Sequence, residues 1–441
     1  MLPFTSITRS NMKKVFYIKD SLENKISYYH LLLFMLLLPF DRTYSTIVLI
    51  SSLLHSLIFL RKDQFAQIDK VVVVLQSVFI LTLVSLLYAS YRSRALDVAG
   101  KQLAIVLFPL LLATTRLNLR KYYNNLLLGF SMGCVATILY LYFDAFHIIL
   151  YNRLPLQHIF SRDFVNHNFA LTIDMHATYL SMLLVIAITW LLHQSLVQPA
   201  ARSTAWYIVS ITILVAGLFQ LGSKSACVSF AIIIMAGFPW LVLNGKKRVR
   251  FIVVSIVLMT VISTVILSAD VFRNRYVTML ENDLRENTGI ADKSGRLDRW
   301  DAALRVIQKS PVWGTGMGSE IPLLKDRYFE RKMYAAWLNS LNVHNQYLGL
   351  LINTGMMGLL VYLFTLGWGL RRAVKKTDIV LFAFIILIAV VSLAEDILDV
   401  NKGIFFYAFF FSFLVLSKRS VTGKYILTER QPGRELTEYI V

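Results

Sequence analysis

Eight arginines and one histidine mark the part of this chain where chemistry is expected. Residues 269–343 form a polar stretch in an otherwise apolar sequence, and they contain Arg273, Arg275, Arg285, Arg296, Arg299, Arg305, Arg327 and Arg331. The stretch ends at His344, where the chain becomes apolar again. Arginine binds phosphate oxygens in pairs, and histidine can take up a proton near neutral pH. The pattern predicts a site for an anionic group, while a lone histidine there could also be a structural hydrogen-bond partner.

An amphipathic helix is predicted over residues 294–310. Its apolar stripe consists of Leu297, Trp300, Leu304 and Ile307. Ser294 could cap this helix, and Pro311 follows its end. Arg296 and Arg299 fall on the first turn, where a helix N-terminus favours anions. The alternative is that both are solvated charges on a polar face.

Glycines predict close approaches of the backbone at two places. The run 314–318 lacks the Lys-Ser/Thr ending of a nucleotide-binding loop, so we interpret it as a tight turn. Gly355 and Gly358, with Thr354, follow His344 on one predicted helix, where small residues would let another helix approach.

Further polar residues lie near the ends of apolar segments. Lys224, in the short linker 222–224, is either an ordinary loop lysine or a cation at the outer end of the bundle. Glu395 lies in a late loop with Asp396 and Asp399, where it could orient His344 or an arginine, or be solvated.

Two His/Asp pairs raise the question of a metal. Asp174 and His176 precede Tyr179, and Asp144 and His147 form the second pair. No His-Glu-x-x-His or comparable cluster occurs, and such pairs commonly satisfy each other, so we predict no metal. The two cysteines, in apolar segments, are expected to be small buried residues.

Composition places most of the chain in a membrane. Of its 441 residues 56% are hydrophobic and 16% are charged, against about 25% charged in soluble proteins. The net charge of +19 does not indicate nucleic acid, because the basic residues lie in short runs between apolar segments. Membrane lipid headgroups and anionic lipid-linked substrates are the better partners.

The apolar segments predict about twelve transmembrane helices, with ten to twelve as the range. They are 26–40, 43–60, 71–90, 103–115, 125–150, 169–192, 206–221, 225–243, 250–268, 345–369, 379–394 and 403–417. The linker 222–224 makes the seventh and eighth either a tight hairpin or one broken helix.

The distribution of basic residues predicts the orientation. One set of loops carries 25 Lys and Arg residues and the other set 8, apart from the long loop. The positive-inside rule therefore places tails 1–25 and 418–441 in the cytoplasm, with no cleaved signal peptide. Between the helices of 26–268 and those of 344–417, loop 269–343 is expected outside. Polar residues gather on this outer face rather than across the membrane depth, and no internal repeat occurs, which argues against a transporter.

Several motifs then follow one another along residues 170–410. They are Gly222-Ser223-Lys224-Ser225-Ala226, Ser294-Gly295-Arg296 before the amphipathic helix, Pro311 with Gly314-Thr315-Gly316, and His344-Asn345 with Gly355 after nine further residues. In this order and in a many-span protein, they resemble the O-antigen ligase family, which shares a domain with O-antigen polymerases and pilin-glycosylating ligases.

This resemblance implies a metal-independent, inverting glycosyltransferase without a cofactor, built as an all-α integral membrane protein with a GT-C-like fold. The donor would be polysaccharide on undecaprenyl diphosphate and the acceptor lipid A–core oligosaccharide, at the periplasmic face of the bacterial inner membrane. His344 matches the family's base, and Arg296 matches the arginine that holds the donor diphosphate. Lys224 stands where the family commonly has arginine, and lysine binds phosphate only as a point charge. The further expected contacts are Arg299, Asn345, Gly355, His176, Tyr179 and Glu395.

Two other functions are compared with this one. An O-antigen polymerase would use the same donor chemistry with a second lipid-linked repeat as acceptor, and the His-Asn-x9-Gly motif favours the ligase. A flippase or other transporter of lipid-linked oligosaccharides should have a charged central cavity and repeat symmetry, which the sequence does not indicate.

Overall fold

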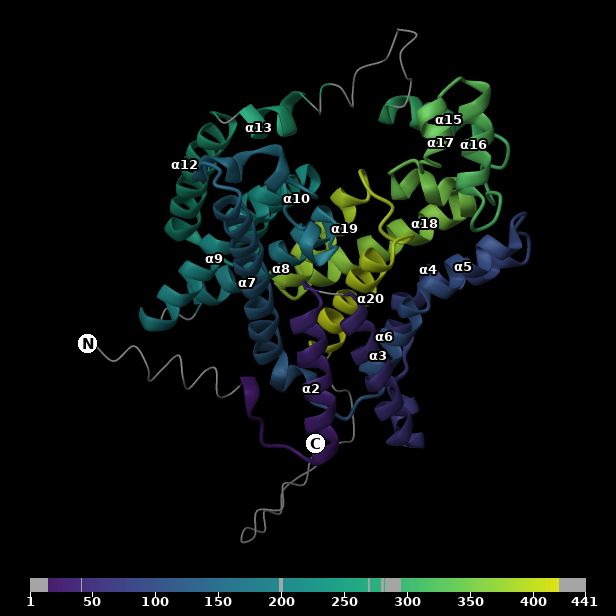
Figure 1. The fold of residues 1–441 in the computed structure, drawn as a ribbon. Coiled ribbons are helices and arrows are strands. Elements are labelled where there is room, and N and C mark those ends of the chain that lie inside the picture. Colours follow the sequence, from purple (N-terminus) through teal and green to yellow (C-terminus); the bar gives the residue numbers. More distant parts are fainter. Residues whose placement is uncertain are drawn as a thin grey trace.

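The computed structural model describes residues 15–40, 42–197, 201–268, 270–278, 281 and 295–419, whose regular structure is entirely helical (Figure 1). Arg285, the predicted cap Ser294 and most of both predicted tails lie outside these residues. The long helices are α2 (Leu22–Leu37), α3 (Arg42–Ile58), α4 (Lys70–Leu86), α5 (Arg92–Gln102), α6 (Ala104–Thr114), α7 (Leu119–Tyr151), α8 (Ala177–Val197), α9 (Ala201–Leu221), α10 (Lys224–Ile232) continued by η5 (Ile233–Gly237) and α11 (Phe238–Leu241), α12 (Gly245–Ser268), α18 (Gln346–Lys375), α19 (Ile379–Val391) and α20 (Asn401–Leu416). The shorter ones are η1 (Lys62–Gln67), η2 (Leu156–Phe160), η3 (Arg162–Phe164), η4 (Leu171–Ile173), α13 (Asp270–Arg273), η6 (Asn274–Thr278), α15 (Arg296–Ile307), α16 (Glu320–Glu330) and α17 (Tyr334–Leu338).

The described chain has the make-up of a helical multi-pass membrane protein. Seven of its helices are long and apolar enough to cross a membrane, and four shorter apolar helices accompany them. Each of the twelve predicted apolar segments falls on a helix. The number of helices that actually cross a bilayer stays a prediction, because several are shorter than the roughly 20 residues that a crossing needs.

The predicted segment 169–192 is wrong at its start. Helix α8 begins only at Ala177, and the residues before it form the short helices η2, η3 and η4. Asn166 and Asp174 adopt left-handed conformations, and the Asn166 N–H donates to the carbonyl of Gln220 at 2.9 Å. Phe169, Ile173 and Met175 of this segment pack into the core without extending α8.

The linker between α9 and α10 is a sharp turn rather than a packed hairpin. Gly222 has a φ of +56°, which ends α9, and Ser223 precedes the first residue of α10. Helix α9 packs on α8 and α7, whereas α10 packs on α19 and α8. The two helices therefore diverge from a common end that carries Lys224.

The centre of the bundle is formed by α8, with α19 and α20 beside it. Residues 177–191 of α8 are all buried, and apolar residues occur on every side of this helix. A helix with this composition is expected in the middle of a bundle. Aromatic side chains of α20 fill the space toward its neighbours: Phe409 packs on α2 and α6, Phe410 on α7, and Phe406 on α19.

A second, smaller core lies outside the bundle centre. Helices α15, α16 and α17 pack on one another and on α18, around Ala302, Val306, Leu324, Tyr328 and Ile352. Figure 1 shows these helices together at one end of the molecule, beside α18. The predicted amphipathic helix 294–310 is thus confirmed as α15.

The apolar stripe predicted for α15 needs a correction. Its buried residues are Arg299, Ala302, Ala303, Val306 and Ile307, whereas Leu304 is 48% exposed. The buried face is therefore centred on the small alanines, which let α15 approach its neighbours closely. Size, rather than hydrophobicity, selects the contact face here.

Helix α18 is broken at Gly355, which has φ +63° and ψ −161°. The carbonyls of Ile352 and Asn353 accept from the N–H groups of Thr315 and Gly316, both at 2.9 Å. The N–H groups of Met356 and Met357, beyond the break, donate to the carbonyls of Pro311 and Val312, at 2.9 and 3.3 Å. Segment 311–318 thus replaces the hydrogen bonds that the break removes from α18.

The expected role of Gly355 and Gly358 changes accordingly. A Cβ on Gly355 would lie 2.3 Å from the Val312 carbonyl oxygen, so the close neighbour is a loop and not another helix. At Gly358 the nearest atoms belong to Thr354 of the same helix. The run 314–318 is confirmed as a tight turn, since its three glycines have φ values of +68°, +89° and +78°.

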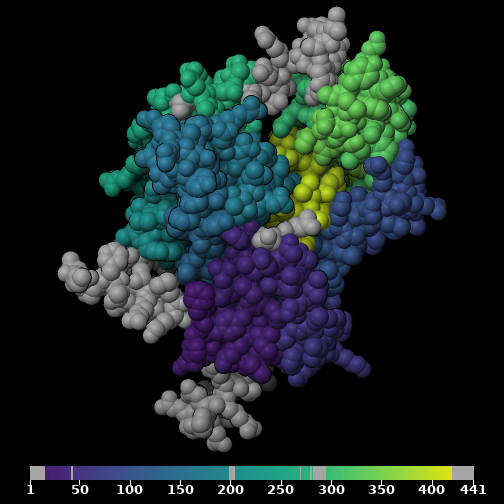
Figure 2. All heavy atoms as spheres, viewed as in Figure 1, coloured from purple at the N-terminus to yellow at the C-terminus, as the bar shows by residue number. Residues whose placement is uncertain are grey.

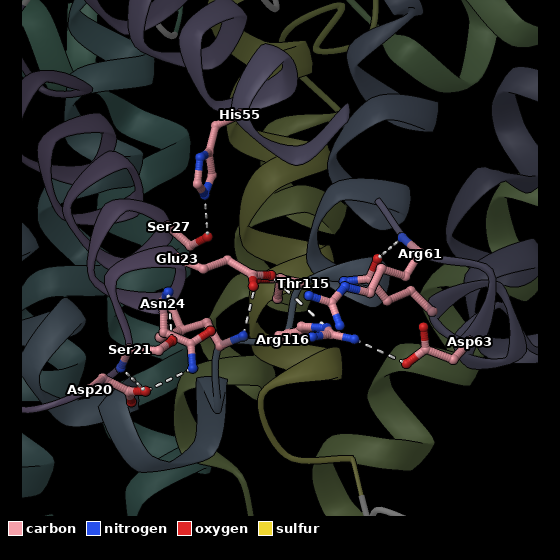
Figure 3. A network of polar contacts seen from close by, with 12 residues as sticks. Asp20, Ser21, Glu23, Asn24, Ser27, His55, Arg61, Asp63, Thr115 and Arg116 are labelled. Atoms are coloured by element: carbon pink, nitrogen blue, oxygen red, sulfur yellow. Dashed lines mark hydrogen bonds and ion pairs between the residues drawn. The ribbon is translucent and has the colours of Figure 1, made fainter. Parts of the chain in front are cut away.

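At the other end of the bundle, loops with the predicted cytoplasmic orientation contact one another. Arg116 pairs with Glu23 at 4.0 Å and with Asp63 at 3.2 Å, and Figure 3 shows this network around the start of α2. Arg419 pairs with Asp69 at 2.8 Å. These loops lie at one end of the bundle, as their shared orientation requires.

Candidate functional site

His344 lies in a tight turn between α17 and α18. Its φ is +49°, a left-handed backbone conformation that residues other than glycine rarely adopt. Asn345 follows as the N-cap of α18, and its side-chain oxygen accepts from the N–H groups of Tyr347 and Leu348 at 3.0 and 3.2 Å. The predicted supporting role of Asn345 therefore has a structural counterpart, since the cap fixes the chain directly after His344.

Helix α15 holds the other side of this turn. Arg299 donates to the carbonyl of Asn342 at 3.0 Å, and the Trp300 indole donates to the carbonyl of Val343 at 3.1 Å. Arg299, expected at the diphosphate, is only 7% exposed. Its burial and its carbonyl partner favour a structural role in placing His344.

Glu395 is the acidic partner of His344. Its Oε2 lies 3.6 Å from the Nδ1 of His344, and Thr178 donates to its Oε1 at 3.2 Å. Burial raises the pKa of Glu395, but His344, His176 and Arg296 lower it further, so it lies below its ordinary value. An ionised carboxylate beside one ring nitrogen leaves the other nitrogen to take up a proton.

Arg296 belongs to this site because its charge acts on the Glu395 carboxylate. It is the first residue of α15, directly after the N-cap Gly295, and it is half-buried. Its charge contributes to the lowered pKa of Glu395. Its guanidinium and the N-terminus of α15 can therefore act on one anion close to His344.

Two further histidines meet in front of α8. The rings of His167 and His176 are 4.2 Å apart, and their Nδ1 atoms accept from the N–H groups of Ala177 and Thr178 at 3.4 and 3.3 Å. Burial lowers the pKa of His176 to about 4, and burial and Arg275 lower that of His167. Both rings are neutral acceptors, as suits the positive end of a helix.

The predicted His/Asp pairs do not form. Lys402 donates to the carbonyl of Asp174 and lies 3.9 Å from its carboxylate, whereas His176 contacts the His167 ring and the Thr178 N–H. Asp144 accepts from Thr172 at 2.6 Å, and His147 stacks on Phe143. The spacing was misleading for Asp174 and His176 because the residues before α8 are not α-helical, and for Asp144 and His147 because each side chain in α7 has another partner.

Tyr179 lies inside α8 and is 3% exposed, with its ring 5.3 Å from that of His176. Its side chain packs behind the histidines and is too buried to contact a substrate directly. Gly355 likewise lies at the break of α18 and acts on the site through the 311–318 segment.

A second cationic region lies across the histidines from Arg296. Arg275, in η6, donates to the carbonyl of Gly222 at 3.2 Å, next to Lys224 at the start of α10. Its charge lowers the pKa of His167, which in turn lies against His176. Contacts and longer-range electrostatic interactions thus link the Gly222 turn through His167 and His176 to Glu395, His344 and Arg296.

Figure 2 shows a recess at this end of the molecule. Its floor is formed by yellow C-terminal residues, and its sides are formed by blue residues and by the green helices. Among the residues that the structure describes, no group of three or more His, Cys, Asp or Glu side chains could hold a metal ion.

The sequence reasoning missed His167, Arg275 and Lys402 as members of this site. Arg275 was counted only as one of eight loop arginines, and no periodic pattern distinguishes it. His167 lies nine residues before His176, a spacing that becomes meaningful only because the intervening segment folds back on α8.

A known protein family matches part of the chain. No curated protein matches the chain. Residues 208–363 match the family model described as O-Antigen ligase. The matched region contains Lys224, Arg275, Arg296 and His344, whereas His176 and Glu395 lie outside it. The family predicted from the motifs is thereby confirmed, and the chain carries an O-antigen ligase domain at residues 208–363.

Proposed function

We propose that the protein is an O-antigen ligase that transfers polysaccharide from undecaprenyl diphosphate to lipid A–core oligosaccharide. The single observation that carries the proposal is the pairing of His344 with the ionised Glu395, beside Arg296 at the start of α15. A base, its orienting carboxylate and a cation for the leaving group are the parts that such a transfer needs.

The reaction is proposed as one inverting displacement. The Nε2 of His344 takes the proton of the acceptor hydroxyl, while Glu395 at Nδ1 stabilises the imidazolium that forms. The acceptor oxygen bonds to the anomeric carbon as the bond from that carbon to the diphosphate oxygen breaks. The lipid diphosphate leaves with the electron pair, and the proton passes from His344 to solvent.

The cations on both sides of the histidines would stabilise the diphosphate. Arg296 can form paired hydrogen bonds with its oxygens, and Lys224 and Arg275 add charge from the other side. Positive charge at fixed positions stabilises a leaving diphosphate without a bound metal. This supports metal-independent chemistry, and the GT-C-like fold is proposed only from the family resemblance.

The test is the substitution His344→Ala in cells that lack the chromosomal copy, with lipopolysaccharide analysed on a gel. The proposal predicts that lipid A–core persists, polymer attached to it disappears, and undecaprenyl-linked polymer accumulates. The matched control is His147→Ala, which removes a histidine of α7 that stacks on Phe143. Wild-type ligation in the His344→Ala strain would refute the catalytic assignment.

The same gel distinguishes the polymerase. Short lipid-linked repeats without long polymer would indicate that the protein joins repeats to one another and does not transfer them to the core. Lipid-linked intermediates that stay on the cytoplasmic side of the membrane, with none on its outer side, would indicate that the protein is a flippase.

A further inference from the structure

Two buried carboxylates lie beneath the turn that carries His344. Glu320, the first residue of α16, is 4% exposed, and Asp396, in the loop before α20, is 2% exposed. The Glu320 Oε1 accepts from the N–H of Val343 at 3.0 Å, and the Asp396 Oδ1 accepts from the N–H of Asn345 at 3.1 Å. The peptide groups on both sides of His344 are therefore held by carboxylates from separate elements.

The Oδ2 of Asp396 is buried without a hydrogen-bond partner among the described residues, and the Asn353 side chain is the neighbour that acts on the second oxygen of Glu320. Both carboxylates face Gly349 of α18. A Cβ at this glycine would lie 2.9 Å from the Glu320 Oε2 and 3.5 Å from the Asp396 Oδ1. Two ionised carboxylates buried beside the same glycine would be strongly unfavourable. A proton held by the pair removes one of the two charges.

The pKa shifts agree with this geometry. Burial and the charge of Asp399 raise the pKa of Glu320 to about 8. Burial, followed by Glu320, Asp399 and Glu395, raises the pKa of Asp396 well above its ordinary range. Burial also raises the pKa of Asp399 to about 6, and Lys101 opposes that shift.

We propose that Glu320 and Asp396 share one proton and act as a clamp that fixes the left-handed backbone of His344. They are positioning residues, since they act through the peptide groups of Val343 and Asn345 and touch no reacting atom. The clamp determines where the imidazole lies relative to Glu395 and to the acceptor hydroxyl. In its effect on catalysis the proposal rests on the proposed function, because His344 is there the base.

The clamp also predicts a pH dependence. The titratable groups that interact with the pair are Asp399 and Glu395 from the same loop, Tyr328 from α16 and Tyr179 from α8. Around them, Lys101 of α5 acts on Asp399, Arg299 of α15 acts on Tyr328, and His344 pairs with Glu395. Loss of the shared proton would leave two repelling charges beneath the turn. Transfer activity should therefore fall on the alkaline side, in addition to any effect of other groups.

The test compares Glu320→Gln and Glu320→Ala in the full-length protein in lipid nanodiscs. Glutamine keeps an oxygen for the Val343 N–H and is neutral, so it reproduces the charge of the protonated pair without a titratable proton. We expect Glu320→Gln to keep most of the kcat and to lose the alkaline decline that is due to the pair. Glu320→Ala should lower kcat about 100-fold, the cost of a small displacement of a catalytic group, with little change in KM.

Hydrogen exchange of peptides covering 341–347 provides a readout that does not depend on catalysis. Glu320→Ala should raise the exchange rate at Val343 about tenfold, as expected for one lost hydrogen bond. The matched control is Glu330→Gln at the other end of α16, whose carboxylate is 58% exposed and pairs with Arg327. Asp396→Asn is the reciprocal variant, and it keeps the acceptor for Asn345.

The outcomes separate the clamp from the proposed function. If Glu320→Ala exchanges like Glu330→Gln, the clamp is wrong. If Glu320→Gln keeps the wild-type alkaline decline, the shared proton is wrong. If exchange changes as expected but the wild-type protein transfers no polysaccharide to lipid A–core, the clamp stands and the proposed function fails.

Discussion

Replacing Gly355 with alanine should separate the 311–318 segment from α18. The φ of +63° and ψ of −161° lie in a region that is nearly exclusive to glycine, and another residue there costs about 1–3 kcal/mol. The new Cβ would also lie 2.3 Å from the Val312 carbonyl oxygen and 2.6 Å from the Gly314 nitrogen. Because both contacts are with backbone, the segment must move as a whole.

That movement weakens the backbone hydrogen bonds that cross the break. Thr315, Gly316, Met356 and Met357 each donate one of these bonds, and each contributes about 0.5–1.5 kcal/mol net. With the conformational cost, we expect the free energy of unfolding to fall by about 3–9 kcal/mol, the upper value applying if all four bonds are lost. Transfer activity should fall as well, because the segment joins α15 and α16, which hold His344.

Gly367→Ala is the matched control on the same helix. A Cβ at Gly367 would meet nothing within 4 Å, and alanine is the better helix former by about 0.5–1 kcal/mol. Unfolding can be followed by tryptophan fluorescence during titration of mixed micelles with SDS. If Gly355→Ala unfolds at the same SDS fraction as Gly367→Ala, the described break does not stabilise the protein and the reasoning is refuted.

Further predictions concern the site itself. Glu395→Gln should lower kcat about 100-fold with little change in KM, since it removes the charge that stabilises the His344 imidazolium; equal kcat in a steady-state transfer assay would contradict this pairing. Arg296→Lys should keep more activity than Arg296→Ala but less than wild type, because lysine cannot form paired bonds to phosphate. The control Arg305→Ala, on the exposed side of α15, should not change the activity. The folded-state pKa of His176, about 4, lies below the ordinary 6.5, so His176 contributes stability that is present above pH 6.5 and is lost as pH falls toward 4. His176→Asn, which keeps an acceptor for the Thr178 N–H, should flatten unfolding curves measured between pH 4 and 6.5. Chelator added to a purified transfer reaction should leave its rate unchanged, and restoration of a lost rate by a divalent metal would refute metal independence.

The parts of the fold that depend on local pattern were predictable from the sequence. Apolar length located the helices, and apolar spacing with Pro311 located α15. The break at Gly355 was not predictable, because it depends on hydrogen bonds from residues about 40 positions earlier. The start of α8 was missed for the same reason, since Asn166 is bonded to the end of α9.

For the candidate site, motif spacing identified residues but not their neighbours. His344 and Arg296 stand out because each is at the edge of a recognisable element. Glu320 and His167 carry no comparable signal, because their importance depends on burial and on partners that are distant in the sequence. Charge alone could not distinguish Arg299, which is buried under the turn, from Arg296 beside Glu395.

The break in α18 has a consequence for the height of the site above the lipid. Residues 356–370, between the break and Arg371, cover about 22 Å of the roughly 30 Å of the hydrocarbon layer. About five residues before the break then complete the crossing, and the rest of 346–354 can stand in the headgroup region. This arrangement would raise His344 roughly 6 Å above the hydrocarbon edge, at a level where a diphosphate can remain hydrated while its polyprenyl chain stays in the bilayer.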